Sequence, residues 1–280
     1  MECENYMDSE ELAYRLRIHA LKMVSHAHAS HIGGILSCCD IVSVLYNDII
    51  KYDINNVKND KRDRVILSKG HNGVVIYAVL AEIGFFPLEE LKTYGNNGGK
   101  FSGHISHKHI PGVEVTTGSL GHGIGIACGM ALNGKLRSKP YNVYCIIGDG
   151  ECNEGSVWEA IMLAHQYKLA NLTVIVDANG MQAMGRTDDV INMEPMAKKW
   201  QAFGWTVVEV NDGHNHDQLR KAFKMNPNGL PKVIIAKTIK GKGVSFMENQ
   251  LVWHYRDPQG KQLQQAIEEV VAAYNAKSFD

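Results

Sequence analysis

Apolar residues along this chain follow two different spacings. Short continuous runs rich in Val and Ile predict buried strands, and longer segments with apolar residues three to four positions apart predict helices. We expect strands at 64–68, 142–148, 171–178, 206–210 and 232–238, and helices at 9–25, 39–50, 74–84, 120–136, 153–169 and 261–276, with further helices before and between the last two strands. This alternation predicts an α/β fold with a mostly parallel sheet covered by helices on both faces.

The segments outside the strands refine this picture. Ser9 suits the N-cap of the first helix, because its hydroxyl can accept a hydrogen bond from a free backbone N–H. Residues 95–119 are rich in Gly, His, Ser and Thr and show little periodicity, and so long an irregular stretch inside a compact domain is usually functional. Because no low-complexity linker or repeat divides the chain, we expect one domain over residues 1–280.

The bulk composition narrows the class of protein. With 280 residues, 45% of them hydrophobic and 21% charged, the chain is an ordinary soluble globular protein. A formal net charge of −1 leaves no basic surface for nucleic acid. No apolar run approaches the ~20 residues that cross a bilayer, so we expect no membrane segment. The acidic N-terminus, MECENYMDSEEL, lacks the features of a signal peptide, which favours a cytoplasmic location.

The cysteines form no Cys-x-x-Cys pair, and most stand in apolar surroundings. This pattern favours free buried thiols in a reducing compartment. Cys152 adjoins a glycine motif, but no activating base is evident beside it, so we interpret it as structural. The full set is Cys3, Cys38, Cys39, Cys128, Cys145 and Cys152.

Polar residues beside glycine end two of the expected strands. One strand stops at Gly148-Asp149-Gly150 and the next at Asn179-Gly180, with one helix between them. A right-handed crossover makes such strands parallel and often adjacent, so both side chains would emerge at the edge of the sheet where ligands gather. Carboxylate and amide oxygens suit Mg²⁺ or Ca²⁺. Gly148 and Gly150 would let the backbone approach a phosphate beside that metal, and a helix start supplies free N–H groups.

A turn is the alternative for each dipeptide, since Asp-Gly and Asn-Gly favour turns. For either one alone the turn is the better interpretation. The pair, joined by a helix between two buried strands, favours a site for a metal and a phosphate.

The same stretch resembles a known cofactor motif. Gly-Asp-Gly, 28 residues and then Asn179 is similar to the motif of thiamine diphosphate enzymes. Further blocks resemble the transketolase N-terminal domain over about residues 10–260: RDRVILSKGH at 62–71, PGVEVTTGSLGHG at 111–123, NLTVIVDANG at 171–180, and KTIKGKG with a later Trp-His at 237–254. ASHIG at 29–33 and SGHISH at 102–107 stand where that family has SGHPG and PGHPE.

The resemblance implies a role for each matching residue. Asp149, Asn179 and the carbonyl of Met181 would hold Mg²⁺ or Ca²⁺. The implied cofactor-binding residues are His71, Gly118, Leu120, Gly148, Asp149, Gly150, Glu154, Asn179, Lys240 and His254. The implied catalytic residues are His31, His71, His104, His254 and Glu154, with the histidines moving protons around the reacting carbons and Glu154 at a subunit contact near the partner's glutamate.

The resemblance also implies a partner. The pyrimidine-binding and C-terminal domains of single-chain transketolases do not follow, so the chain resembles the N-terminal subunit of a split transketolase. We expect a C-terminal subunit that carries the pyrimidine-binding domain and the catalytic glutamate, a heterotetramer with two copies of each chain, and sugar or sugar phosphate substrates. A 1-deoxyxylulose phosphate-type synthase subunit and a non-catalytic scaffold of the same fold are the alternatives.

Several residues depart from the family pattern or stand outside it. His122 replaces a glutamine and Ile32 a proline, and either could alter the substrate channel. His26, His28 and His31 could suggest zinc, but no cysteine or acidic fourth ligand is near. His19 is typical of a helix face, and His214 and His216 of a surface loop or helix start.

Overall fold

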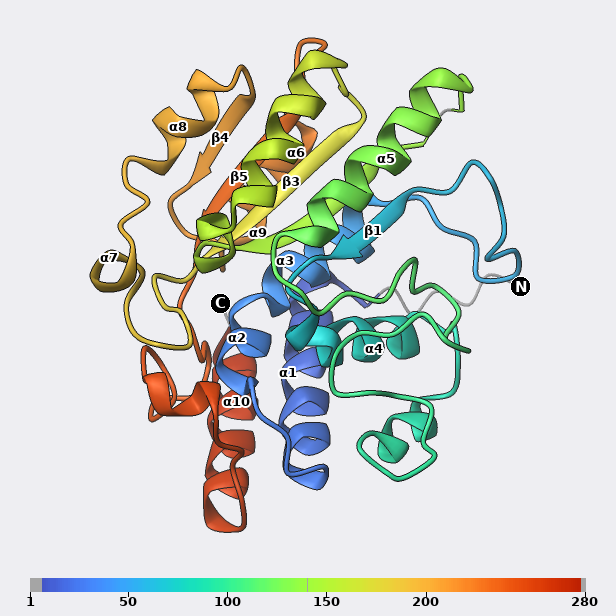
Figure 1. Cartoon of the computed structure of the whole chain (residues 1–280). Helices are drawn as coiled ribbons and strands as arrows, with labels where there is room; N and C mark the ends of the chain where they lie inside the picture. The colour runs from blue at the N-terminus through green and yellow to red at the C-terminus, as the bar shows by residue number, and fades with distance from the viewer. Residues whose placement is uncertain (1–6, 140, 278–280) are drawn as a thin grey trace.

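The computed structural model describes residues 7–139 and 141–277, and these contain one five-stranded sheet. Every strand pair is parallel, in the order β1-β2-β3-β5-β4 (Figure 1). The strands are β1 (Arg64–Leu67), β2 (Val143–Gly148), β3 (Leu172–Ala178), β4 (Thr206–Val210) and β5 (Lys232–Lys237). All five expected strands are therefore present, and β2 and β3 are neighbours as predicted.

Side chains of the central strands pack on both faces of the sheet. Along β2, Tyr144 and Ile146 enter one hydrophobic cluster, whereas Val143, Cys145 and Ile147 enter the other. Since successive side chains of a strand point to opposite faces, a strand covered on both sides must be apolar throughout. This explains the continuous apolar runs in the sequence.

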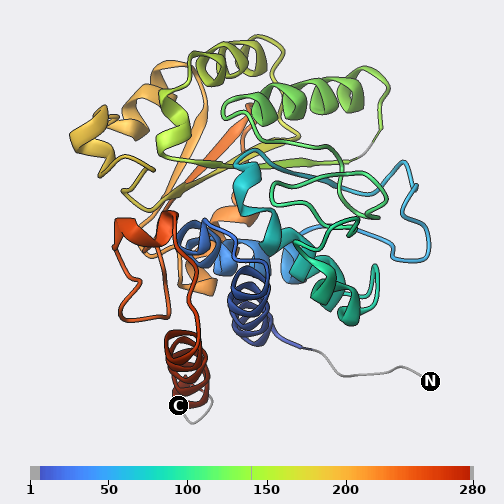
Figure 2. The same ribbon diagram turned by 60° about the horizontal axis from the view of Figure 1, so that its bottom comes forward.

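Helices cover both faces of the sheet (Figure 1). One layer holds α5 (His122–Leu136), α6 (Gly155–Gln166) and α8 (Met196–Ala202), and the other holds α1 (Ser9–His26), α2 (Ile32–Ser37), α3 (Cys39–Val44), α4 (Gly73–Glu82) and α9 (His216–Lys224). The C-terminal helix α10 (Lys261–Lys277) lies beside α1 (Figure 2). Shorter elements are α7 (Thr187–Val190), the 3₁₀ turns Gly70–Asn72, Leu88–Thr93, Gly150–Asn153 and Leu251–His254, and a π turn at Leu45–Ile49. The predicted α/β fold is confirmed.

Local details differ from the sequence predictions in three places. Asp8, rather than Ser9, caps α1, because its carboxylate accepts a hydrogen bond from the Glu11 N–H at 2.7 Å. The helix expected at 39–50 ends at Val44 and continues as the π turn. Helix α2 was not predicted, because the sequence IGGILS contains two glycines that weaken helix propensity. Residues 95–119 form neither helix nor strand, as expected.

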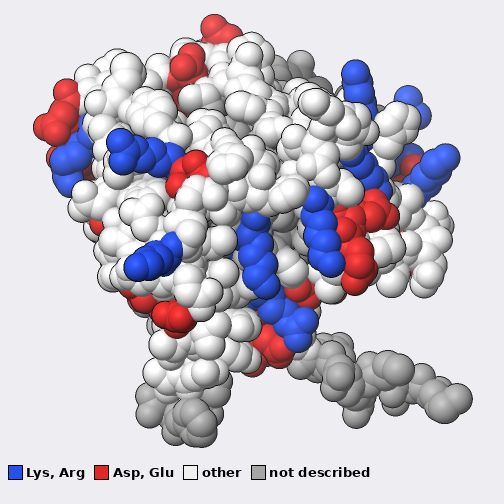
Figure 3. All heavy atoms as spheres, turned by 90° about the horizontal axis from the view of Figure 1, so that it is seen from below, with Lys and Arg blue, Asp and Glu red and all other residues white. Residues whose placement is uncertain are grey.

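The surface seen from below carries basic and acidic side chains interspersed with one another (Figure 3). Within residues 7–139 and 141–277, no helix is both long and apolar enough to cross a membrane.

Candidate active site at the carboxyl ends of the strands

One cavity of about 520 Å³ lies beyond the carboxyl ends of the strands. Its wall draws on the segments that follow β1, β2, β3 and β5, and on the loops around residues 31, 104 and 118–120. All thirteen residues singled out from the sequence line it: His31, His71, His104, Gly118, Leu120, Gly148, Asp149, Gly150, Glu154, Asn179, Met181, Lys240 and His254. The sequence thus identified residues that the fold brings together across more than 200 positions, from His31 to His254.

Asp149 and Asn179 meet at the edge of the sheet where β2 and β3 end. The Asp149 carboxylate accepts hydrogen bonds from the backbone N–H of Gly150 at 2.8 Å and of Gly180, the residue after Asn179, at 2.6 Å. The Asn179 amide oxygen accepts one from the Met181 N–H at 3.1 Å. Burial, and after it the nearby Asp177 carboxylate, raise the pKa of Asp149 to about 6. Proximity of a cation would favour the ionised form of this carboxyl.

Asp177 orients Asn179 and was not predicted as a site residue. It is fully buried at the end of β3, with its carboxylate 2.5 Å from the Lys69 ammonium. The carboxylate also accepts hydrogen bonds from Ser37, from Thr238 and from the Asn179 amide nitrogen, the last at 3.2 Å. Because the amide nitrogen of Asn179 points to Asp177, its amide oxygen points away from Asp177. Burial opposes both charges, but their mutual attraction raises the pKa of Lys69 and lowers that of Asp177.

Lys240 is a second buried lysine at the cavity, with a different environment. Its ammonium nitrogen lies 3.4 Å from the carbonyl oxygens of Met181 and Gln182, and 3.3 Å from the His254 ring. No carboxylate among the described residues lies within ion-pair distance of it. Burial, and after it the charge of Lys69, lower the pKa of Lys240 to about 8.

Four histidines form a cluster in the cavity. The His31 ring lies 4.7 Å from His254, 5.0 Å from His71 and 5.9 Å from His104, measured between ring centroids. Burial is the main cause that lowers the pKa of His31 to about 4, of His71 to about 2 and of His254 to about 3. At neutral pH these three rings are therefore uncharged, and each carries one donor and one acceptor nitrogen.

His31 is held in an unusual conformation. Its backbone is left-handed, with φ of 75°, and its N–H donates to the His254 carbonyl at 2.9 Å. Its ring nitrogen Nδ1 is buried without a hydrogen-bond partner. Strained backbone and unsatisfied buried polar atoms both tend to occur at functional sites.

The remaining wall is tied together by Glu151, another residue that the sequence did not single out. Its buried carboxylate accepts hydrogen bonds from Ser68 and from the N–H groups of Gly121, at 2.8 Å, and Gly148, at 3.1 Å. It therefore joins the segment after Leu120 to the end of β2. Glu154, the N-cap position of α6, is exposed at the rim.

Other sequence interpretations turn out differently. Ile32 is fully buried in the core and His122 turns its ring to the Leu120 carbonyl, so neither lines the cavity. His216 does begin helix α9, as expected, but neither His214 nor His216 is a surface residue, because both turn inward onto Asp40. The cysteine prediction is confirmed for the described residues, since Cys152 and the other described cysteines are buried and free; Cys3 lies outside the described residues.

Histidine, cysteine and carboxylate side chains do not by themselves make a metal site in the part of the chain that the structure describes, since no group of three or more is suitably placed. The oxygen set at Asp149, Asn179 and Met181 is a different kind of arrangement. Mg²⁺ commonly binds one or two protein oxygens of this kind together with the phosphates of a ligand. The buried Asp149 carboxylate with its raised pKa, the Asn179 carboxamide oxygen, and a lysine with no carboxylate partner among the described residues fit a metal diphosphate.

Comparisons with known proteins show the family of the chain. The family model described as "Transketolase, thiamine diphosphate binding domain" matches residues 8–277. One of the subunits of the apulose-4-phosphate transketolase of Phocaeicola vulgatus is 41% identical over 251 residues, 89% of each chain. The 6-deoxy-6-sulfo-D-fructose transketolase subunit SqwG of a Clostridium species is 40% identical, over 90% of this chain and 92% of that one.

A solved structure gives the same result at the level of the fold. The transketolase of Campylobacter jejuni is similar with a TM-score of 0.86 and 31% identity, over 94% of this chain. The chain spans only 42% of that longer protein. The chain belongs to the transketolase family of transferases, as a subunit that carries the family's N-terminal, thiamine diphosphate-binding domain.

Proposed function

We propose that this chain works with a separate C-terminal subunit to transfer a two-carbon ketol unit from a ketose to an aldose. The observation that carries the proposal is the gathering of all thirteen candidate residues around one cavity. The lengths of the relatives support the split arrangement, since the chain matches subunits of its own size but less than half of the Campylobacter enzyme. The partner would supply the pyrimidine-binding domain and the catalytic glutamate.

In this proposal the metal is Mg²⁺ or Ca²⁺, held by Asp149, Asn179 and the Met181 carbonyl. Lys240 and His71 would lie against the diphosphate, with Gly148 and Gly150 letting the backbone come close. Gly118 and Leu120 would contact the aminopyrimidine end. Thiamine diphosphate, when bound, supplies the electron sink for cleaving a carbon–carbon bond, and the protein orients the reactants and excludes water.

The histidines would handle the protons of the sugar. Because His31, His71 and His254 are neutral at pH 7, each can accept a proton at one ring nitrogen while donating a hydrogen bond from the other. His104 is exposed and would meet the substrate first. Glu154, at the exposed rim, would face the partner subunit.

The proposed substrate class rests on the relatives' names. One relative is named for a sugar phosphate and another for a sulfonated sugar, so both names specify an anionic sugar. We propose a ketose phosphate or a specialised analogue as donor for this chain. We further propose a single domain over residues 1–280, a heterotetramer with two copies of each subunit, and a cytoplasmic location.

The test is reconstitution. The chain would be mixed with its C-terminal partner, thiamine diphosphate and Mg²⁺, and ketose consumption measured with a panel of aldose acceptors. Activity should require both chains. A mixture that consumes no ketose, although the wild-type chain binds the cofactor, would contradict the proposal.

Asp149→Ala tests the metal ligands separately. Mg²⁺-dependent binding of thiamine diphosphate, measured by calorimetry, should be lost while the chain stays folded. The unfolding midpoint without cofactor should fall modestly, because the N–H groups of Gly150 and Gly180 lose their acceptor. Asp60→Ala, at an exposed carboxylate paired with Lys139, is the control and should bind normally. Binding that survives in Asp149→Ala would refute the ligand assignment.

A further inference from the structure

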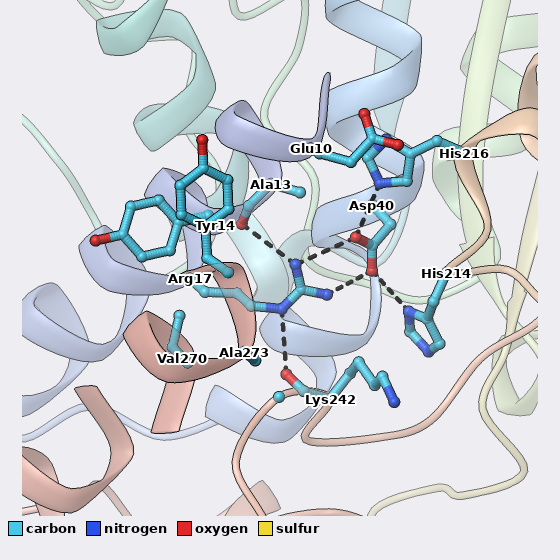
Figure 4. Close-up of a pocket in the computed structure, with 12 residues that line it drawn as sticks. Glu10, Ala13, Tyr14, Arg17, Asp40, His214, His216, Lys242, Val270 and Ala273 are labelled. Atoms are coloured by element: carbon cyan, nitrogen blue, oxygen red, sulfur yellow. Dashed lines mark hydrogen bonds and ion pairs between the residues drawn. The ribbon is translucent and has the colours of Figure 1, made fainter. Parts of the chain in front are cut away.

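A buried ionic cluster lies behind the cavity, between α1, α3 and the loop after β4. Its centre is Asp40, in the first turn of α3, whose side chain is 7% exposed. The Arg17 guanidinium pairs with both carboxylate oxygens, and His214 and His216 each contact one of them (Figure 4). Burial opposes the charge of Asp40, but the Arg17 guanidinium holds its pKa well below the usual range.

The contacts of His214 determine which ring nitrogen carries its proton. Nε2 accepts a hydrogen bond from the Ile239 N–H at 2.8 Å, so it must be unprotonated. Nδ1 therefore carries the proton and donates it to Asp40, at 2.6 Å. The ring thus connects Asp40 to the backbone just before Lys240.

Arg17 makes the corresponding connection on the other side of Lys240. Its Nε donates to the Lys242 carbonyl at 3.2 Å, while its terminal nitrogens hold Asp40 (Figure 4). Two main-chain hydrogen bonds complete the attachment of this segment: Gly241 N–H to the Gly33 carbonyl, and Asn249 N–H to the Lys240 carbonyl, both at 2.8 Å. Four consecutive residues, 239–242, are each tied down, and two of the four ties lead to Asp40.

We propose that Asp40 is a positioning residue which, through Arg17 and His214, fixes the backbone on both sides of Lys240 and so places the Lys240 ammonium in the cofactor cavity. This inference rests on the proposed role of Lys240 beside the diphosphate. Asp40 itself does not line the cavity and touches no reacting group.

We infer that the cluster serves to fix the geometry of the backbone rather than to add stability. A buried ion pair adds little net stability, because the loss of hydration offsets much of the attraction between the charges. A lysine side chain, in contrast, has several rotatable bonds, and placing its ammonium requires first that its Cα be fixed. Lys240 has no carboxylate partner within the described residues to orient it, so the backbone anchors on either side must do this.

The test compares two histidines that share Asp40 but differ in what else they touch. His214→Phe removes the acceptor for the Ile239 N–H. His216→Phe also removes a contact to the Asp40 carboxylate. The other ring nitrogen of His216 contacts Ser9 rather than residues 239–242, so this variant is the matched control. His214→Gln retains an acceptor oxygen and should restore part of the function.

Hydrogen exchange of the full chain without cofactor gives the first measurement. Exchange in residues 237–249 should become faster in His214→Phe, stay at the wild-type rate in His216→Phe, and be intermediate in His214→Gln. Equal exchange in His214→Phe and wild type would overturn the proposal, whatever the cofactor does. If His214→Phe does not fold, Arg17→Lys serves instead, because it keeps a charge beside Asp40 but lacks the Nε–H that reaches Lys242.

Binding of thiamine diphosphate with Mg²⁺ gives the second measurement. His214→Phe should weaken it about tenfold, as expected for partial loss of one charge-assisted contact. In a Lys240→Met background the same substitution should have no further effect, because the residue through which it acts is gone. Full additivity of the two substitutions would overturn the proposal. Failure of the wild-type chain and its partner to bind the cofactor would instead contradict the proposed function and leave the exchange result standing.

Discussion

Replacing His71 by glutamine should make the folded chain less sensitive to acid. In the unfolded chain a histidine has its pKa near 6.5, whereas burial lowers that of the folded His71 to about 2. The unfolded state therefore takes up a proton as the pH falls below about 6.5, and the folded state does not. Protonation then favours unfolding, so stability is lost toward acid and is fully present above the unfolded pKa.

The size of the effect follows from the two pKa values. Between pH 7.5 and pH 5, one histidine that stays neutral in the folded state costs about 2 kcal/mol of stability by proton linkage. The glutamine variant has no group that titrates at this position, so the difference in unfolding free energy between wild type and variant should shift by about 2 kcal/mol in favour of the variant over that range. Comparing the two chains cancels the groups they share, including His31, His254 and Asp149.

Urea unfolding of the chain without cofactor, at several pH values across this range, measures the shift. Gln262→Ala is the control, because this exposed side chain carries no titratable group, and it should give a curve parallel to that of wild type. If the His71→Gln curve is also parallel to wild type, His71 takes up its proton in the folded chain, and burial does not keep this ring uncharged.

Two further substitutions test buried polar groups that support the fold. Lys232→Met removes the ammonium that donates to the carbonyls of Ala222, Phe223 and Met225 at the end of α9. This substitution should lower the unfolding free energy by about 1–3 kcal/mol. The control Lys221→Met, at an exposed lysine, should leave it unchanged. Glu151→Gln places an NH₂ group where the carboxylate accepts backbone N–H groups, and should cost about 1–3 kcal/mol in the same urea assay; an unchanged midpoint would mean that Glu151 does not hold the two segments together.

The sequence predicted those parts of the structure that depend on local pattern. A strand covered on both faces needs continuous apolar residues, so β2 and β3 could be recognised from their own residues. The polar residues that end these strands could also be predicted to lie together, because a parallel sheet brings the carboxyl ends of its strands to one edge. The order and spacing of the transketolase-like blocks supplied the distant loops, including those of His31 and His254.

Residues whose role depends on a distant partner were missed. Asp177 and Lys69 are 108 positions apart, and neither stands in a pattern that predicts an ion pair. His214 looked like a loop residue because its neighbours are polar, yet its partner Asp40 is 174 positions away. Side chains of this kind become interpretable only when the fold has placed both members of the pair.

The two buried lysines of the cavity show why such pairs matter for function. Lys69 has its charge satisfied by Asp177, so burial does not prevent its pKa from being raised, and it has little to gain from a further anion. The Lys240 ammonium lies near two carbonyl oxygens and the His254 ring, with no carboxylate of the described residues at ion-pair distance, and burial lowers its pKa to about 8. A bound diphosphate would favour the charged form of Lys240 and would be attracted to that charge. Lys69 offers less attraction, because its charge is already paired with Asp177. The same residue type thus has two environments at one sheet edge: Lys69 orients Asn179 by way of Asp177, and we propose that Lys240 is a cation that binds the ligand. Because the position of the Lys240 ammonium depends on the backbone that carries it, we propose that the buried Asp40 cluster behind residues 239–242 supports the function of the cavity although it lies outside it.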